Sequence, residues 1–103
     1  MAKFILGFHG SAATPDDMQD DTMMAAWIGW YKGMGSAVAD MGNPAGPSKI
    51  VGAGGKVSNP GSNPLTGYSI IEARDIDAAI DLAKGCPIYS AGGTVEVAEL
   101  MPM

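Results

Sequence analysis

The chain has 103 residues, with six Lys or Arg against eleven Asp or Glu, one His and a formal charge of −5. That length predicts one domain, residues 1–103, and the 47% hydrophobic content argues against a disordered chain. The acid excess argues against binding to nucleic acid or to anionic membranes, because both attract basic surfaces.

The sequence also indicates the cellular compartment of the protein and whether it holds a metal or cofactor. No apolar run approaches the roughly 18 residues of a membrane span, and the N-terminus lacks a signal-peptide pattern, so we expect a cytoplasmic protein. The single cysteine, Cys86, permits no internal disulfide, and no Cys/His pair suits zinc. We therefore expect neither a metal nor a cofactor. Because Cys86 follows a predicted helix C-terminus, we expect an unreactive thiol.

A strand is predicted over Lys3–His9. Its alternate positions hold Phe4, Leu6 and Phe8, which gives one apolar face and places His9 on the other. The residues after the strand predict a helix.

The start of this helix is open, at Thr14 or at Asp21 or Thr22, all residue types that cap helices. Apolar side chains then recur at three- and four-residue steps: Met23, Trp27, Trp30, Met34, Val38 and Met41. Gly42 is the predicted C-cap.

The second half of the chain contains three further strands and one helix. The first predicted strand covers 48–53 and is followed by a turn at Gly54–Gly55 and a loop over 59–64. A second strand follows over 67–73, and then a helix capped by Asp75 and ending at Lys84–Gly85. The last strand covers 94–100. The helix has an apolar stripe of Ile76, Ala79, Ile80 and Ala83.

This order predicts an α+β fold, a ferredoxin-like βαββαβ plait with a four-stranded antiparallel sheet and two helices on one face. The uncovered face is expected to carry Ile5, Val51 and Ile70 beside His9, Lys49 and Tyr68. An apolar face of this size is rarely left to water, so we expect a homodimer, or a higher oligomer, in which two sheets close a barrel.

Several segments in this order resemble the YCII-related family, DGPF-domain relatives included. They are residues 3–9, Met41-Gly42 followed by Gly46-Pro47, residues 67–72, Asp77-Ala78-Ala79 and residues 92–97. The resemblance implies a small, cytoplasmic, dimeric α+β barrel of mostly unassigned function. It also implies, for some relatives, lyase chemistry that eliminates HCl from chlorinated hydroquinones through a proposed His–Asp pair. Asp40 matches the acid of that pair, whereas Trp30 or Tyr31 stands where the first-helix His would be.

His9 is the candidate general acid or base, because imidazole exchanges protons at neutral pH. Asp40 would orient it if the end of the helix passes over the end of the strand. The alternative is a structural His9 bonded to backbone and a solvated Asp40. Glu96 and Glu99 lie on opposite faces of the last predicted strand, so at least one of them is expected to be solvated.

Five further residues are candidates for substrate binding. Lys49 and Tyr68 would hold a carboxylate or enolate oxygen, or form an ordinary cross-strand pair. Trp30, with its neighbours Trp27 and Tyr31, would stack on an aromatic ligand, or belong to the core. Asn43 and Asn63 would line the rim of a pocket, or serve the turns that Asn and Pro favour.

Two functions follow from these residues. The first is a small-molecule enzyme or ligand-binding protein with a pocket at the dimeric barrel, using His9 for lyase or proton-transfer chemistry on a small aromatic or anionic substrate. The alternative is a non-catalytic dimeric interaction or sensing module. The sequence does not decide whether the protein is an enzyme.

Overall fold

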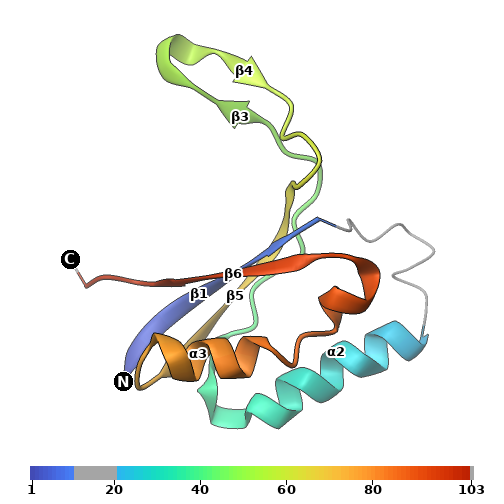
Figure 1. The fold of residues 1–103 in the computed structure, drawn as a ribbon, viewed down its shortest axis with the longest axis vertical. Coiled ribbons are helices and arrows are strands. Elements are labelled where there is room, and N and C mark those ends of the chain that lie inside the picture. The colour runs from blue at the N-terminus through green and yellow to red at the C-terminus, as the bar shows by residue number, and fades with distance from the viewer. Residues whose placement is uncertain (11–20, 103) are drawn as a thin grey trace.

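The computed structural model describes residues 1–10 and 21–102 and shows a four-stranded sheet, two helices and a projecting hairpin (Figure 1). The elements are β1 Ala2–His9, α2 Asp21–Met34, β2 Val38–Asp40, β3 Ile50–Val51, β4 Val57–Ser58, β5 Leu65–Ala73, α3 Ile76–Ala83 and β6 Thr94–Glu99, with short 3₁₀ turns at Gly35–Ala37, Ala53–Gly55 and Pro87–Ala91. The alternative helix start at Thr14 lies outside the described residues.

The main sheet has the strand order β2-β5-β1-β6, and every neighbouring pair is antiparallel. Both helices lie on the same side of it (Figure 1). The predicted α+β plait is therefore confirmed. Asp75 caps α3 as expected, since its carboxylate accepts a 2.8 Å hydrogen bond from the Ala78 N–H.

The core lies between the sheet and the helices. Alternation along β1 buries Phe4, Leu6 and Phe8, as predicted, and α2 contributes Trp30 and Met34. The sheet and α3 add Ser69, Ile71, Ala73, Ala79 and Ala83, and the segment after α3 adds Cys86 and Ile88. Half of the predicted α3 stripe faces this core, because the two alanines are buried while the two isoleucines stay more than a third exposed.

The predicted end of the first helix is wrong. The helix stops at Met34, where Gly35 takes a left-handed φ of 56° that breaks the helical repeat. The chain then forms β2, in which Val38 pairs with Ile71 of β5. The apolar residues at 38 and 41 continue the helical spacing by coincidence, and they belong to a strand and a loop.

The strand predicted over 48–53 is also wrong as a member of the main sheet, because β2 occupies the edge next to β5. Ile50–Val51 instead pairs with Val57–Ser58 in a separate hairpin. We call residues 48–59 the arm. Its turn lies at Gly54–Gly55, as predicted, and it projects away from the sheet (Figure 1).

The side of the sheet away from the helices is open. At its centre Ile5 pairs with Ile70 on one side and Ala98 on the other. We call this surface the open face. Ile5, Ile70, Tyr68 and His9 belong to it as predicted, whereas Lys49 and Val51 lie in the arm. Within the described ranges, neither helix combines the length and the apolar character needed to cross a bilayer.

Candidate functional site

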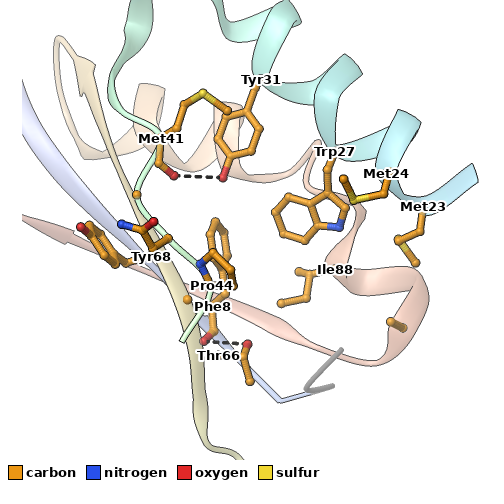
Figure 2. Close-up of a pocket in the computed structure, with 14 residues that line it drawn as sticks. Phe8, Met23, Met24, Trp27, Tyr31, Met41, Pro44, Thr66, Tyr68 and Ile88 are labelled. Carbon is orange, nitrogen blue, oxygen red and sulfur yellow. Dashed lines mark hydrogen bonds between the residues drawn. The ribbon is translucent and has the colours of Figure 1, made fainter. Parts of the chain in front are cut away.

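A cavity of about 420 Å³ opens between α2, the start of β5 and the loop after β2 (Figure 2). It lies on the helical side of the sheet. Its lining is mostly apolar and comes from five segments: Phe8; Met23, Met24, Trp27 and Tyr31; Met41, Gly42, Asn43 and Pro44; Thr66, Gly67 and Tyr68; Ile88 and Ala91. The volume falls in the range of small-molecule sites, about 300–1,000 Å³.

One face of α2 forms the aromatic wall. Met23, Trp27 and Tyr31 are spaced by four residues, so their side chains lie on the same face of the helix. Trp27 meets Phe8 edge to face, with ring centroids 5.2 Å apart and planes at 84°. This geometry is favourable for aromatic pairs and fixes both rings without filling the cavity.

The loop of residues 41–45 forms the opposite wall and is held against β5. The Tyr68 N–H donates to the Asn43 carbonyl at 3.3 Å, and the Ala45 N–H donates to the Thr66 carbonyl at 2.9 Å. Gly42 has a left-handed φ of 71°, and a β-carbon there would overlap with the Tyr68 carbonyl. Gly67 is buried and closely packed, since a β-carbon there would lie 3.2 Å from the Asn43 carbonyl oxygen and 3.4 Å from the Phe8 ring.

A short hydrogen-bond chain joins the two walls. The Ser69 hydroxyl donates to the Met41 carbonyl at 2.7 Å and lies 2.6 Å from the Tyr31 hydroxyl. Burial raises the pKa of Tyr31, and the hydrogen bond to Ser69 opposes this only in part. The phenol therefore stays neutral at physiological pH.

His9 lies on the open face and does not line the cavity. Its Nε2 is 3.0 Å from Glu96 Oε1 and its Nδ1 is 3.3 Å from the Asn63 carbonyl. Both partners only accept, so both contacts are hydrogen bonds at once when each ring nitrogen carries a proton. The carboxylate beside His9 is thus Glu96, which the alternating pattern of the last strand had left unassigned.

Asp40 does not meet His9. It pairs with Ile70, whose partner on β1 is Ile5, so it lies two strands across and four residues along from His9, roughly 16 Å away. Its carboxylate accepts a 2.8 Å hydrogen bond from the Gly42 N–H. The expected orienting role fails because the helix ends before Asp40, and the carboxylate braces the cavity loop.

The model of the YCII-related domain matches residues 11–103. The chain belongs to the YCII-related family. A search of curated proteins found no match.

The family match covers β2, β5 and the helices that build the cavity, whereas His9 precedes it. Of the two positions that stand where the first-helix His of some relatives would be, Tyr31 lines the cavity and Trp30 does not. Trp30 is 9% exposed, and its indole N–H donates to the Leu82 carbonyl at 2.9 Å. The expected stacking by Trp30 is therefore replaced by its alternative, a place in the core.

The remaining candidates are scattered. Asn43 lines the cavity, and Asn63 meets His9 through its backbone carbonyl. The Tyr68 ring lies on the other side of β5 from Trp27 (Figure 2). The Lys49 ammonium is 2.6 Å from the Asn59 side-chain oxygen in the arm, so Lys49 and Tyr68 do not form the expected anion site.

Metal and thiol chemistry find no support in the described residues. Within residues 1–10 and 21–102, no group of three or more His, Cys, Asp or Glu could hold a metal ion. Cys86 is buried, and burial raises its pKa to about 11. A thiol of that acidity is a poor nucleophile at neutral pH.

The sequence pointed to Trp27 and Tyr31 as ring-stacking residues and to Asn43 as part of a pocket rim. Sequence reasoning missed Gly67 and Thr66. A signal was available for Gly67, because a glycine inside a strand often marks a close approach of backbone or ligand, whereas Thr66 carried none.

Proposed function

We propose that the protein binds a small, planar, largely apolar molecule in the cavity between α2 and β5. The supporting observation is the cavity itself, about 420 Å³ with Trp27 and Phe8 on its wall. An apolar cavity of about 150 Å³ suffices for benzene, so this one has room for two fused rings. Among the described lining residues none is Lys, Arg, His, Asp or Glu, which favours an uncharged ligand over the anionic one expected from sequence.

Thermal unfolding with 2-naphthol, followed by circular dichroism, tests this proposal. A ligand at ten times its Kd adds about 1.4 kcal/mol to the free energy of unfolding, so the transition moves to higher temperature. Ala91→Phe places a ring at the cavity wall and is expected to remove the shift. The matched control Ala26→Phe, on an exposed position of α2 outside the cavity, is expected to keep it. No shift in the wild type, or equal shifts in both variants, would contradict the proposal.

Proton transfer by His9 remains a separate hypothesis, supported by the contact with Glu96. Neighbouring strand residues point to opposite faces, so His9 and the cavity residue Phe8 serve different sides of the sheet. A substrate of His9 would have to lie on the open face. If a turnover is found, His9→Gln is expected to abolish it with little loss of stability, and an unchanged rate would dismiss this role.

A second candidate function, association with another copy of the chain, is favoured by the arm. Ile50, Val51 and Val57 are 51%, 70% and 60% exposed there, and an isolated two-stranded hairpin is marginally stable in water. Lys49 and Lys56 give the arm two positive charges and no negative one, whereas the whole chain carries −5. A basic apolar arm thus complements the acidic body of a second copy, whose open face carries Ile5, Ile70 and Glu96.

Sedimentation analysis of the molecular mass, at a micromolar protein concentration and at a tenfold higher one, tests the association. We expect the wild type to be a dimer and Val51→Ser with Val57→Ser to be a monomer. Ile80→Ser is the matched control, because Ile80 is an exposed apolar residue of α3, on the helical side of the sheet. A monomeric wild type, or a dimer that survives the double arm variant, would contradict the association.

A further inference from the structure

Two side chains of the cavity wall, Tyr31 and Thr66, donate their hydroxyl protons to groups of the protein itself. Tyr31 lies 2.6 Å from Ser69 Oγ and 3.5 Å from the Met41 carbonyl. The Ser69 proton goes to that carbonyl at 2.7 Å, so the Tyr31 proton goes to Ser69. In the reverse arrangement Ser69 donates to Tyr31 and Tyr31 donates to the carbonyl. The Tyr31 proton stays inside the protein either way, and a phenol oxygen lone pair is left over.

Thr66 follows the same rule. Its hydroxyl is 3.2 Å from the Phe8 carbonyl and 3.3 Å from the Gly10 carbonyl, and carbonyl oxygens only accept. The Thr66 hydroxyl therefore donates its proton to a backbone carbonyl, while its oxygen can still accept a hydrogen bond from a ligand.

The backbone of the cavity wall adds few donors. The N–H groups of Gly42 and Tyr68 donate to Asp40 and to the Asn43 carbonyl, and Pro44 has none. Among the described lining side chains, two carry N–H donors: Trp27, whose ring packs in the aromatic cluster, and Asn43, which is exposed to solvent. The side-chain oxygens of Tyr31 and Thr66 are thus left as acceptors for a ligand.

We infer that the cavity selects a neutral planar ring that donates a hydrogen bond, through a ring N–H or a hydroxyl, to the oxygen of Tyr31 or Thr66. This inference rests on the proposed function and names its ligand class. At the oxygen of Tyr31 or Thr66, a ligand with only acceptors, or with a carboxylate, would place two acceptors together without a proton between them, which costs the desolvation of both groups.

Calorimetric titration with indole and 1-methylindole tests the inference, because the two molecules differ only in whether the ring nitrogen carries a hydrogen or a methyl group. The wild type is expected to bind indole about three- to tenfold more tightly, the worth of one hydrogen bond. If apolar burial alone decided, the extra methyl group would make 1-methylindole the tighter ligand.

Three variants test which oxygen is responsible for the preference for indole over 1-methylindole. It is expected to fall in Tyr31→Phe or in Thr66→Val and to vanish when both changes are combined. The matched control is Tyr89→Phe, whose hydroxyl donates to the Ala83 carbonyl outside the cavity lining, and it is expected to keep the preference.

The outcomes separate the two proposals. Equal affinities for both rings, or tighter binding of 1-methylindole, with Ala91→Phe still blocking both, overturn the donor preference and leave the cavity as a binding site. If neither ring binds, the proposed function fails as well. A preference for indole that survives the combined variant also overturns the inference.

Discussion

Gly42 lies directly against the backbone of Tyr68, so closely that a β-carbon at position 42 would overlap with the Tyr68 carbonyl oxygen. Its φ of 71° adds a second reason for glycine, since side chains are strained in the left-handed region. This contact holds the loop that walls the cavity against β5. The cavity thus depends on a residue that contributes no side chain to it.

Replacing Gly42 by Ala is expected to lower the free energy of unfolding by at least about 2 kcal/mol, from backbone strain and from displacement of the loop. Urea denaturation measures the loss, and 2-naphthol binding should fall with it. Gly46→Ala is the control, because Gly46 is exposed, has an ordinary φ and no atom within 4 Å of its β-carbon position. It should stay within about 0.5 kcal/mol of the wild type. An equally stable Gly42→Ala protein would show that the loop is not pinned there.

The two tryptophans are expected to separate stability from binding. Trp30→Phe loses the hydrogen bond to Leu82 and the packing of a buried indole, and should cost about 1–3 kcal/mol of stability. Trp27→Phe keeps an aromatic ring at a half-buried position and should cost less, while ligand affinity changes. Denaturation and calorimetry on both variants measure this. Equal losses of stability, with binding affected by Trp30 alone, would reverse the assignment.

Replacing either of two glycines in α2 by alanine should raise the free energy of unfolding. No atom lies within 4 Å of the β-carbon position of Gly29 or Gly33, and both lie within the helix. Each change to Ala is expected to stabilise the protein by about 0.5–1 kcal/mol, because glycine loses more backbone entropy than alanine on helix formation. The midpoint of urea denaturation reports the gain. A loss of stability would mean that a second surface packs on this side of α2.

The stability of the protein should fall at high pH because of Cys86. Its pKa is raised by burial from 9.0 to about 11, so the folded thiol keeps a proton that the unfolded thiol releases. The contribution is complete below pH 9 and is lost as the pH rises to about 11. Urea titrations at pH 8, 9 and 10 measure the decline, and Cys86→Ala should flatten it. Parallel pH profiles for the two proteins would contradict this origin.

The contact between His9 and Glu96 should contribute little to stability. The Glu96 side chain is 72% exposed, and exposed ion pairs are typically worth less than about 1 kcal/mol. A double-mutant cycle with His9→Gln and Glu96→Gln should give a coupling in that range, and it should decrease with added salt. The cycle is measured in the monomeric variant with Val51→Ser and Val57→Ser, because a second subunit on the open face would cover the pair. A coupling above about 2 kcal/mol there, indifferent to salt, would contradict the prediction.

The sequence was sufficient for most elements because their signals are local. Strict alternation marked β1 and β6, and the Asp75 cap marked the start of α3. The end of α2 was missed because Val38 and Met41 continue the helical spacing, while the left-handed conformation of Gly35 cannot be read from a glycine alone. Strand β2 has three residues and is defined by its pairing with β5, a contact between distant parts of the chain.

The candidate site was less predictable for the same reason. Trp27, Tyr31 and Asn43 were each named from sequence, but their meeting depends on the close approach of Gly42 to Tyr68 and of Asn43 to Gly67. The pairing of His9 with Glu96 depends on the register between β1 and β6, in which Gly7 lies opposite Glu96 and His9 opposite Thr94. Spacing along the chain does not set that register.

The most direct measurement is a chemical-shift titration of the ¹⁵N-labelled protein with 2-naphthol. We predict that the largest chemical-shift changes occur at Tyr31, Gly42, Gly67 and the indole N–H of Trp27. The signals of Gly54 and Gly55 in the arm are expected to stay unchanged. Changes centred on Ile5 and Ile70 of the open face, or no changes at saturating ligand, would contradict this prediction.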